Sequence, residues 1–595
     1  MTPVLSLLLA CSGSSDTVVR SGTLPFPDAG YVVDGHLALS PDDFETPWDG
    51  TPVDTDRVAW RTGFSSVQTT VFQFEAALDG ASLPGPDEGA TDGSVQLWDL
   101  TDGVPLPCFA EVDLYPDNPE VPTMLVRPLV PMPVGHRVAV VVTTAVRTSA
   151  GTALEAVDWW AAAVAGEPTE GFDADHTRDL AAELEALGLS DVAVAVDYPI
   201  GDGTAPTRHL TETVSIPGSW RFDRTWTEGL PEGAWQALEG SFSTDDWLVD
   251  DGAFDLDDLG IPALQGTTDA ELYVYFPESV RDAAPGTVPV WIFGHGIFSH
   301  PENYLGADDD PSRVADLANR AGAIVVGTTW RGLTQADILV PVLVGNDFGR
   351  LPELSDKLAQ GVANTVALAR LLAEGELLDD PVFEGLPRRD GLRYYGISLG
   401  GIEGAVLMAS TDLVQHGVLH VGGGAFSTLL ERSSHWTTFE PLLEDGTASP
   451  AARQVLYSAS QLYWDVADPA GWVDDLVGRS LIWQESVGDE QVPNLTTELM
   501  ARAMGATLLE PAATAPFGIE SGVPVSGPAL VQFDPQVALP APGNRPAEVS
   551  GAHGAPRLWD GTTAQTLRFL EADDPGVIVH LCGGSVCAAD NPGAL

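Results

Sequence analysis

The sequence predicts an α/β fold with a mostly parallel sheet, preceded by an all-β sandwich. From Glu271 onward, short apolar runs alternate with amphipathic segments, which is typical of strands and helices in a parallel sheet. From about Arg57 to Thr152, β-prone runs are instead separated only by turn-rich clusters and show no helical period, which favours a sandwich. The chain of 595 residues is long enough for two or three domains.

The charge of the chain limits its partners. The formal net charge is −59 at pH 7, so a phosphate backbone would be repelled and nucleic acid is not an expected partner. The acidic residues are spread along the chain, and Lys357 is its one lysine. A solvated acidic surface explains this pattern. Adaptation to a salty medium, or weak calcium binding at Asp308–Asp310, is the alternative, although Asp310 as the N-cap of a helix starting at Pro311 explains that triplet without a metal.

The N-terminus predicts export. Residues 1–10 form a signal whose apolar run, Val4–Ala10, is too short to span a bilayer. The end of this run, Leu-Leu-Ala-Cys11, resembles a bacterial lipobox, although no lysine or arginine precedes it. The resemblance implies that Cys11 is lipidated and anchors the protein to a membrane of the bacterial cell envelope, with residues 11–45 as a flexible tether. No later segment is long and apolar enough to cross a bilayer.

The other cysteines fit an oxidising compartment. Cys582 and Cys587 flank a short turn and could form a disulfide, which leaves Cys108 as a free buried thiol. None of the cysteines has the spacing of metal ligands, so we expect no metal and no cofactor.

The expected organisation has three parts after the tether. Residues 46–155 form the sandwich, residues 156–265 a mixed connecting region, and residues 266–595 the α/β domain. The stretch from Pro128 to Leu154, PLVPMPVGHRVAVVVTTAVRTSAGTAL, resembles the last strands of Ig-like modules of bacterial surface proteins and of some lipoprotein lipases. That resemblance implies a module that spaces or docks. We expect the pair Trp159–Trp160 to be core.

Within the α/β domain, the strands are expected at residues 271–277, 288–296 and 323–332, and a long amphipathic helix at 355–375. A short strand, Leu392–Tyr395, then enters the turn Gly396-Ile-Ser398-Leu-Gly400, and a small-residue helix leaves it. Strand, Gly-x-Ser-x-Gly turn and helix in this order are typical of a nucleophile elbow, whose glycines avoid Cβ clashes in a very tight turn. A helix-prone insertion follows at about 426–477, and a last helix at about 562–572.

The order of elements from Glu271 onward resembles the α/β-hydrolase family of serine esterases and lipases. That resemblance implies that Ser398 is the nucleophile, that Asp489 in a loop after a strand is the triad acid, and that His553 is the base. Glu490 is a near competitor of Asp489 and Asp412 a distant one; His580 is the alternative to His553.

The resemblance also implies an oxyanion hole. Gly294-His295-Gly296-Ile297 ends the strand two before the elbow strand and resembles the family's His-Gly loop. The N–H groups of Ile297 and Leu399 would then bind the oxyanion, and His295 would shape the loop rather than act as a base.

The layout resembles bacterial extracellular lipoprotein lipases, which implies hydrolysis of lipids or other carboxylic esters at a membrane-anchored enzyme. A peptidase or polyester depolymerase on the same fold, or a surface binding lipoprotein without turnover, are the alternatives. The insertion lies where the family carries a cap. Its aromatic and apolar residues form either an acyl pocket or the core of the cap: Trp436, Phe439, Leu462, Tyr463, Trp464 and Trp472.

Overall fold

The computed structural model describes residues 25–44, 52–89, 91–115, 121–169, 173–226, 230, 233–305, 313–444, 449–523, 527–571 and 578–593. The predicted signal, the lipidation site Cys11 and the triplet Asp308–Asp310 lie outside these residues. Among the residues described, no helix combines the length and the apolar character needed to span a membrane.

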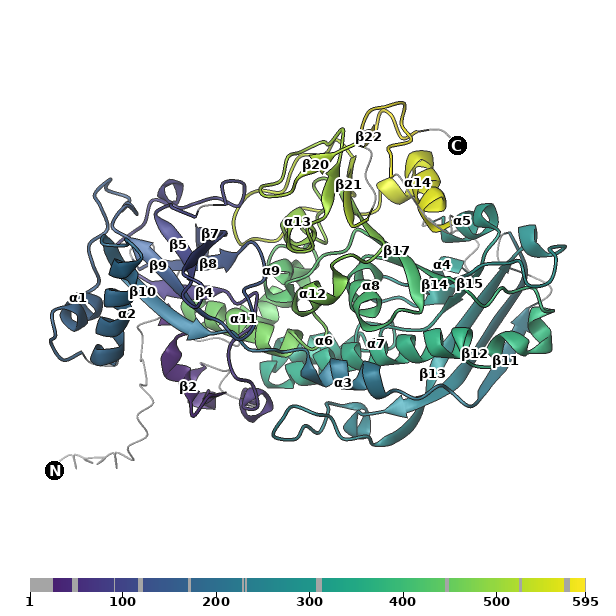
Figure 1. Cartoon of the computed structure of the whole chain (residues 1–595), viewed down its shortest axis with the longest axis horizontal. Helices are drawn as coiled ribbons and strands as arrows, with labels where there is room; N and C mark the ends of the chain where they lie inside the picture. Colours follow the sequence, from purple (N-terminus) through teal and green to yellow (C-terminus); the bar gives the residue numbers. More distant parts are fainter. Residues whose placement is uncertain are drawn as a thin grey trace, which may run out of the picture.

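The N-terminal part is a sandwich of two four-stranded antiparallel sheets (Figure 1, purple and blue). One sheet has the order β1-β4-β8-β7 and the other the order β10-β9-β5-β6. Their facing side chains, such as Phe72 and Val140, share one core. The strands are β1 (Pro25–Phe26), β4 (Thr70–Gln73), β5 (Val95–Asp99), β6 (Val104–Leu106), β7 (Cys108–Val112), β8 (Thr123–Pro128), β9 (Arg137–Thr143) and β10 (Val192–Pro199).

Two expected boundaries are wrong. The tether is expected to reach residue 45, yet β1 already pairs with β4, because Phe26 is buried against the sandwich core. The connecting region 156–265 does not exist as a separate unit. Its strand β10 completes the second sheet of the sandwich, and helices α1 (Asp158–Val164) and α2 (Ala174–Ala186) cover that sheet's outer face, with Trp160 in their shared core as expected.

The rest of that region joins the α/β sheet, which starts at β11 and not at residue 266. The sheet runs β11-β12-β13-β15-β14-β16-β17-β18-β21-β19-β20 (Figure 1). Strands β11 to β13 are antiparallel, and β13 is antiparallel to β15; the central strands from β15 to β21 are parallel. The bounds are β11 (Trp220–Trp226), β12 (Ala234–Asp246), β13 (Gly266–Pro277), β14 (Val290–Gly294), β15 (Ile324–Gly327), β16 (Leu392–Ile397), β17 (Val414–His420), β18 (Leu481–Ser486), β19 (Thr507–Leu509), β20 (Ser521–Gly522), β21 (Ala529–Asp534) and β22 (Cys587–Ala588), which pairs with β21.

Helices cover both faces of this sheet because the strands are apolar on both sides. Ile292 of β14 faces the helices α7 and α8, while its neighbours Trp291 and Phe293 face α5 and α14. The helices are α3 (Ala205–Thr213), α4 (Pro301–Leu305), α5 (Val314–Ala321), α6 (Leu339–Asn346), α7 (Leu351–Ala373), α8 (Leu399–Ser410), α13 (Asn494–Ala503) and α14 (Asp560–Glu571). The expected α/β fold with a β-rich N-terminal part is thus confirmed.

The insertion after β17 is helical, as predicted. It consists of α9 (Phe426–Leu430), α10 (Trp436–Glu444), α11 (Pro450–Trp464) and α12 (Val473–Leu476), which together form a cap beside the carboxyl edge of the sheet. At the C-terminus, Cys582 and Cys587 form the predicted disulfide, and Cys108 is free and buried as expected. Burial raises the pKa of the Cys108 thiol to about 12, so this thiol is unreactive at neutral pH.

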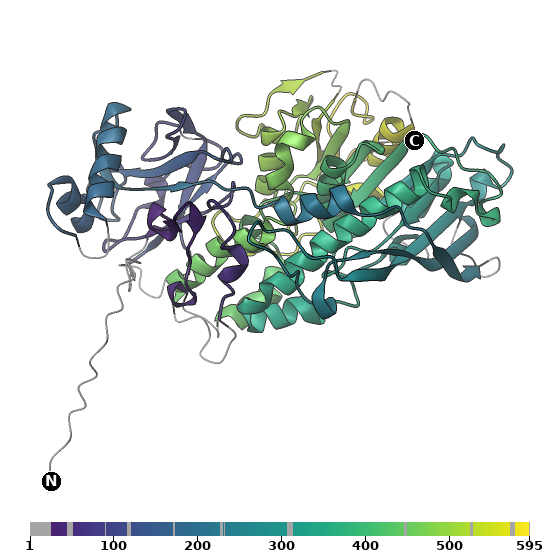
Figure 2. The ribbon, with the colours of Figure 1, turned by 60° about the horizontal axis from the view of Figure 1, so that its bottom comes forward.

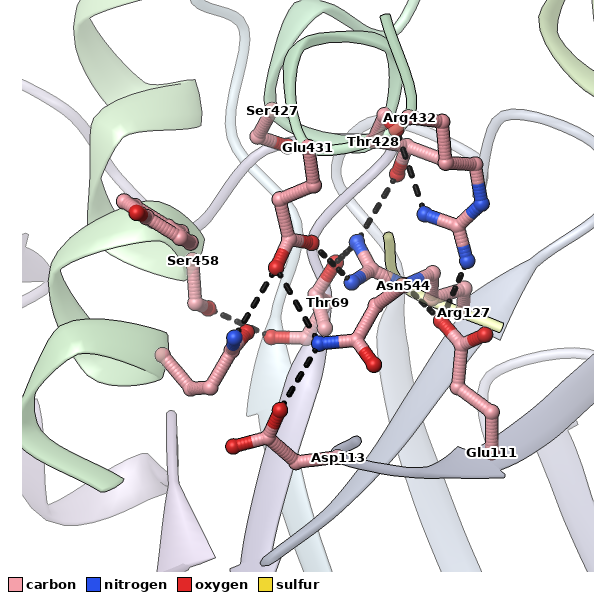
Figure 3. Close-up of polar contacts among 12 residues, drawn as sticks. Thr69, Glu111, Asp113, Arg127, Ser427, Thr428, Glu431, Arg432, Ser458 and Asn544 are labelled. Atoms are coloured by element: carbon pink, nitrogen blue, oxygen red, sulfur yellow. Dashed lines mark hydrogen bonds and ion pairs between the residues drawn. The ribbon is translucent and has the colours of Figure 1, made fainter. Parts of the chain in front are cut away.

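Buried ion pairs join the sandwich to the cap. Arg61 bonds the carboxylate of Asp465 just after α11 at 2.6 Å and the carbonyl of Leu462 at 2.8 Å. Arg127 of β8 pairs with Glu431, which directly follows α9, and Figure 3 shows this pair at the centre of a polar network that includes Glu111 and Thr428. Helix α11 consequently lies between the sandwich and the α/β domain (Figures 1 and 2).

We predict that Arg61→Ala destabilises the folded chain by about 3–5 kcal/mol, because it leaves the Asp465 carboxylate buried without its partner. Arg221→Ala, which removes exposed pairs with Asp223 and Asp269, should leave the stability nearly unchanged because water screens both pairs. Urea unfolding of both variants and of the wild type measures the two effects. Equal losses for the two arginines would contradict a special role of the buried pair.

Candidate active site

The turn after β16 has the geometry of a nucleophile elbow. Ser398 lies between β16 and α8 with φ 59° and ψ −117°. A non-glycine residue at such a positive φ is strained and is kept there only by its surroundings. The Ser398 N–H donates to the carbonyl of His420 at the end of β17 at 2.9 Å, which holds the turn against the neighbouring strand.

The glycines of the motif are required by close backbone contacts. A Cβ on Gly396 would lie 2.1 Å from the Gly400 carbonyl oxygen, and a Cβ on Gly400 would lie 2.1 Å from the Gly294 carbonyl oxygen. Gly401 likewise approaches Gly422, where a Cβ would meet the Gly422 Cα at 2.9 Å. The small residues therefore let α8 and the loop after β14 close around Ser398.

The predicted acid and base are hydrogen-bonded to each other. His553 Nδ1 lies 2.9 Å from Oδ1 and 2.8 Å from Oδ2 of Asp489, and both side chains are buried. Asp489 Oδ1 also accepts the N–H groups of Gln491 at 2.8 Å and Val492 at 3.0 Å. A carboxylate that accepts these bonds requires the proton on Nδ1 of His553, which leaves Nε2 free to act as a base.

Glu490, the competitor for the role of acid, has a different place. Its carboxylate accepts the His553 N–H at 3.1 Å, the Gly551 N–H at 3.2 Å and the Ser550 hydroxyl at 2.9 Å. Burial raises the pKa of Glu490, but these hydrogen bonds outweigh it and the pKa lies below its ordinary value. Glu490 therefore holds the backbone of the histidine loop and does not contact the imidazole nitrogens.

Asp412 and His580, the more distant candidates for acid and base, lie apart from this pair. Asp412 forms an exposed ion pair with Arg479. His580 is buried near the C-terminus, and burial lowers its pKa.

Ser398, Asp489 and His553 follow β16, β18 and β21, so all three lie at the carboxyl edge of the parallel strands. Within the described residues, no hydrogen bond joins Ser398 Oγ to His553. Such bonds are often long in enzymes without substrate and shorten when it binds.

The loop after β14 is shaped by His295, as expected. Its Nε2 accepts the Trp330 N–H at 2.9 Å, and its Nδ1 lies 2.7 Å from the Gly296 carbonyl oxygen. The imidazole is fully buried, which lowers its pKa to about 4, so it is neutral at pH 7. Within the described residues, the N–H groups of Ile297 and Leu399 donate to no other group, and both residues line the same cavity as Ser398.

That cavity is largely apolar and has a volume of about 120 Å³. Its walls come from the loop after β14, from α6 and the start of α7, and from the cap helices α9, α10 and α11. The cap residues divide between the two expected roles. Trp436, Phe439 and Trp464 line the cavity, whereas Leu462, Tyr463 and Trp472 belong to the core of the cap.

The α6 wall was not predicted from the sequence. Pro341, Val344 and Gly345 face the cavity, while Leu339 and Leu343 on the same helix are exposed. The apolar run from Ile338 to Val344 is the signal that could have indicated it. Glu490, Arg127 and Glu431 give no such signal, because their roles depend on partners far away in the sequence.

No protein-family model and no curated protein matches this sequence. Several solved structures are similar at low identity. Acetyl xylan esterase 1 from Thermoanaerobacterium sp. JW/SL YS485 is 13% identical, with a TM-score of 0.36, over 62% of this chain and 93% of that one. A putative dienelactone hydrolase from Klebsiella pneumoniae subsp. pneumoniae MGH 78578 is 15% identical, with a TM-score of 0.25, over 50% of this chain and 87% of that one. The acylaminoacyl peptidase of Pyrococcus horikoshii is 12% identical (TM-score 0.31), over 60% of this chain and 50% of that one.

The strand order, the elbow after the central strand β16 and the helices on both faces define an α/β-hydrolase fold with a helical cap.

We predict that His295 makes the folded state sensitive to mild acid. Its pKa falls from an unfolded value of about 6.5 to about 4 in the fold. The stability that depends on neutral His295 is therefore complete above about pH 6.5 and is lost as the pH falls from there through about 4, a change of roughly 3 kcal/mol. Urea unfolding at pH 7 and pH 4 should show a smaller loss for His295→Gln, which keeps a hydrogen-bond acceptor without the titration. Equal losses in both proteins would contradict this role.

Proposed function

We propose that the protein is a serine hydrolase that cleaves carboxylic esters through Ser398, His553 and Asp489. The observation that carries this proposal is the buried bond between His553 and Asp489 at the same sheet edge as the strained Ser398. His553 Nε2 would take the proton of Ser398 as the hydroxyl attacks the ester carbonyl. Asp489 would stabilise the imidazolium that forms.

The remaining steps follow from the same groups. The tetrahedral oxyanion would accept hydrogen bonds from the N–H groups of Ile297 and Leu399, and each such donor stabilises the transition state by about 3–4 kcal/mol. His553 would then return its proton to the leaving alcohol, and an acyl-enzyme on Ser398 would remain. A water activated by His553 would attack this ester and release the acid.

The cavity supports an acyl group of modest length. Its volume of about 120 Å³ is close to the ~150 Å³ that takes benzene in an engineered apolar cavity, so it suits about six carbons. Its apolar lining favours an ester acyl chain over the polar backbone of a polypeptide, so an ester hydrolase is preferred to the peptidase on the same fold.

We predict that the wild type hydrolyses p-nitrophenyl esters with the highest kcat/KM at acyl lengths of about four to eight carbons. Ser398→Ala and Asp489→Asn should each lower kcat by about 10⁴-fold, because they remove the nucleophile or the group that fixes the histidine tautomer.

Ser410→Ala and Asp412→Asn are the matched controls. Ser410 bonds a carbonyl in its own helix, and Asp412 bonds Arg479 on the surface, so both variants should keep wild-type rates. Equal activity of wild type and Ser398→Ala would refute the hydrolase and leave a binding protein. A wild type that cleaves only peptide p-nitroanilides would favour the peptidase, and a highest rate on long acyl chains or polymers a lipase or polyester depolymerase.

We further propose that the protein is exported and held on a membrane of the bacterial envelope by a lipid on Cys11. The support is the sequence Leu-Leu-Ala-Cys11 after a short apolar run. The sandwich, which resembles Ig-like modules over residues 128–154, would then stand between the anchor and the catalytic domain. Each buried acyl CH₂ contributes about 0.8 kcal/mol, so a multiply acylated cysteine holds firmly.

Cys11→Ala should therefore move the protein from the membrane fraction to the soluble fraction, as followed by fractionation and immunoblotting. Cys108→Ala is the control, because this buried thiol lies in the sandwich core and should leave the membrane fraction unchanged. If Cys11→Ala remained in the membrane fraction, the lipidation proposal would be wrong.

A further inference from the structure

Three polar atoms at the wall of the apolar cavity have no partner among the described residues. Ser427 Oγ of α9, Tyr457 OH of α11 and Trp436 Nε1 of α10 are buried without a hydrogen bond. The three residues are at most 9% exposed and all line the cavity on the side of the cap. The rings of Trp436 and Tyr457 meet edge to face with centroids 5.4 Å apart, so these two belong to one part of the wall. Burial raises the pKa of Tyr457 and the Glu431 charge raises it further, while the Trp436 indole N–H lowers it by interacting with the hydroxyl at a geometry short of a full hydrogen bond.

Two other buried hydroxyls of helix α11 differ from that of Tyr457 because they have partners. Tyr463 of α11 donates its hydroxyl to the Asp54 carbonyl at 2.8 Å, and Ser458 donates to the Thr69 carbonyl at 2.6 Å. Neither residue lines the cavity. These buried hydroxyls facing the sandwich thus have partners, whereas those of Ser427 and Tyr457 do not. A buried polar group left without a partner costs about 1–3 kcal/mol, and a bound ligand can remove that cost.

Two polar groups beside these atoms, Glu431 and Gln461, already have other partners. Glu431 lines the cavity, and its carboxylate is bound to several groups (Figure 3). It pairs with Arg127 and accepts from Gln454 at 2.9 Å and Asn544 at 3.4 Å. The Ser427 backbone is held by Gln461, whose Oε1 accepts the Ser427 N–H at 3.0 Å.

The chemistry of the three groups defines what they can bind. Trp436 Nε1 is a donor only, while the two hydroxyls can donate or accept. An oxygen that accepts hydrogen bonds therefore satisfies all three groups, and an ammonium group does not suit the indole donor. Glu431 and Glu440 act on Tyr457 as negative charges and Arg453 acts as a positive one, so an additional carboxylate in this wall would face the repulsion of two acids and a neutral oxygen is favoured.

We propose that the cavity selects acyl groups that carry a neutral oxygen, a ketone or hydroxyl, several carbons away from the ester carbonyl. This inference rests on the proposed ester hydrolysis and names the class of its substrate. Ser427, Tyr457 and Trp436 form the polar subsite, and the apolar lining around them binds the carbons between the oxygen and the scissile ester. A site built to hydrogen-bond a substrate oxygen discriminates against the analogue that lacks it far more strongly than an apolar pocket discriminates a methylene.

The test compares esters of equal length. The probes are p-nitrophenyl hexanoate and its 4-oxo, 5-oxo and 6-hydroxy analogues, with each rate divided by that of the same ester in buffer. In the wild type, kcat/KM for at least one oxygenated ester should exceed that for hexanoate by about 10-fold or more. Tyr457→Phe and Ser427→Ala should each reduce that ratio by about 10-fold.

Tyr463→Phe and Ser458→Ala remove buried hydroxyls outside the cavity and should keep the wild-type ratio, whatever they do to stability. Ser427→Thr, which restores a hydroxyl, should recover part of the ratio lost in Ser427→Ala. A wild-type ratio near one for every oxygenated ester would overturn the inference and leave the esterase intact. Absence of hydrolysis of every ester, hexanoate included, would overturn the proposed function and this inference with it.

Discussion

The site depends on one constraint, the near contact of three backbone segments around Ser398. The carbonyl of Gly294, the turn glycines Gly396 and Gly400, and the start of α8 occupy a space in which a single extra carbon would lie 2.1 Å from an oxygen. This contact fixes Ser398 at a positive φ and sets the Ile297 loop beside the Leu399 N–H in one step. Ser398 and the proposed oxyanion donors therefore cannot move independently. Their relative position is a property of the backbone and not of flexible side chains.

The histidine side of the site is built differently, from side-chain carboxylates. Two consecutive acids have separate roles: Asp489 orients the imidazole, and Glu490 binds the N–H groups of the loop that carries it. Ser486 adds a hydrogen bond from the end of β18 to the Ala552 carbonyl at 2.7 Å. The acid loop thus determines both where His553 lies and how its ring is oriented. A change in this loop would disturb the position of His553 even if Asp489 itself were kept.

Sequence reasoning found what depends on local patterns. The tight turn at Ser398 between a strand and a helix, the helical insertion and the disulfide between Cys582 and Cys587 are encoded by neighbouring residues, and the structure has them where expected. The predicted domain boundaries are wrong because the strands pair with partners that are distant in the sequence. The strand with Phe26 is predicted to belong to the tether but pairs with β4. The strand Val192–Pro199 is predicted to belong to the connecting region but pairs with β9. The different roles of Asp489 and Glu490 likewise depend on their contacts in the folded structure, since both are acids in the same loop. The cavity wall on α6 has no motif at all.

The pairing of Arg127 with Glu431 has a consequence for whether the two parts of the protein can be produced separately. A strand order alone would place a boundary near Trp220 and suggest that the catalytic half could be made without the sandwich. However, that cut would remove Arg127, Arg61 and Arg57 and leave their partners as unpaired buried carboxylates: Glu431 and Asp465 in the cap, and Asp356 in α7. The α/β half is therefore complete as a sheet but depends on the sandwich for its stability. Joining the α/β half to another carrier domain would require replacement of these acids, so the sandwich has to be inherited together with the α/β half that it supports.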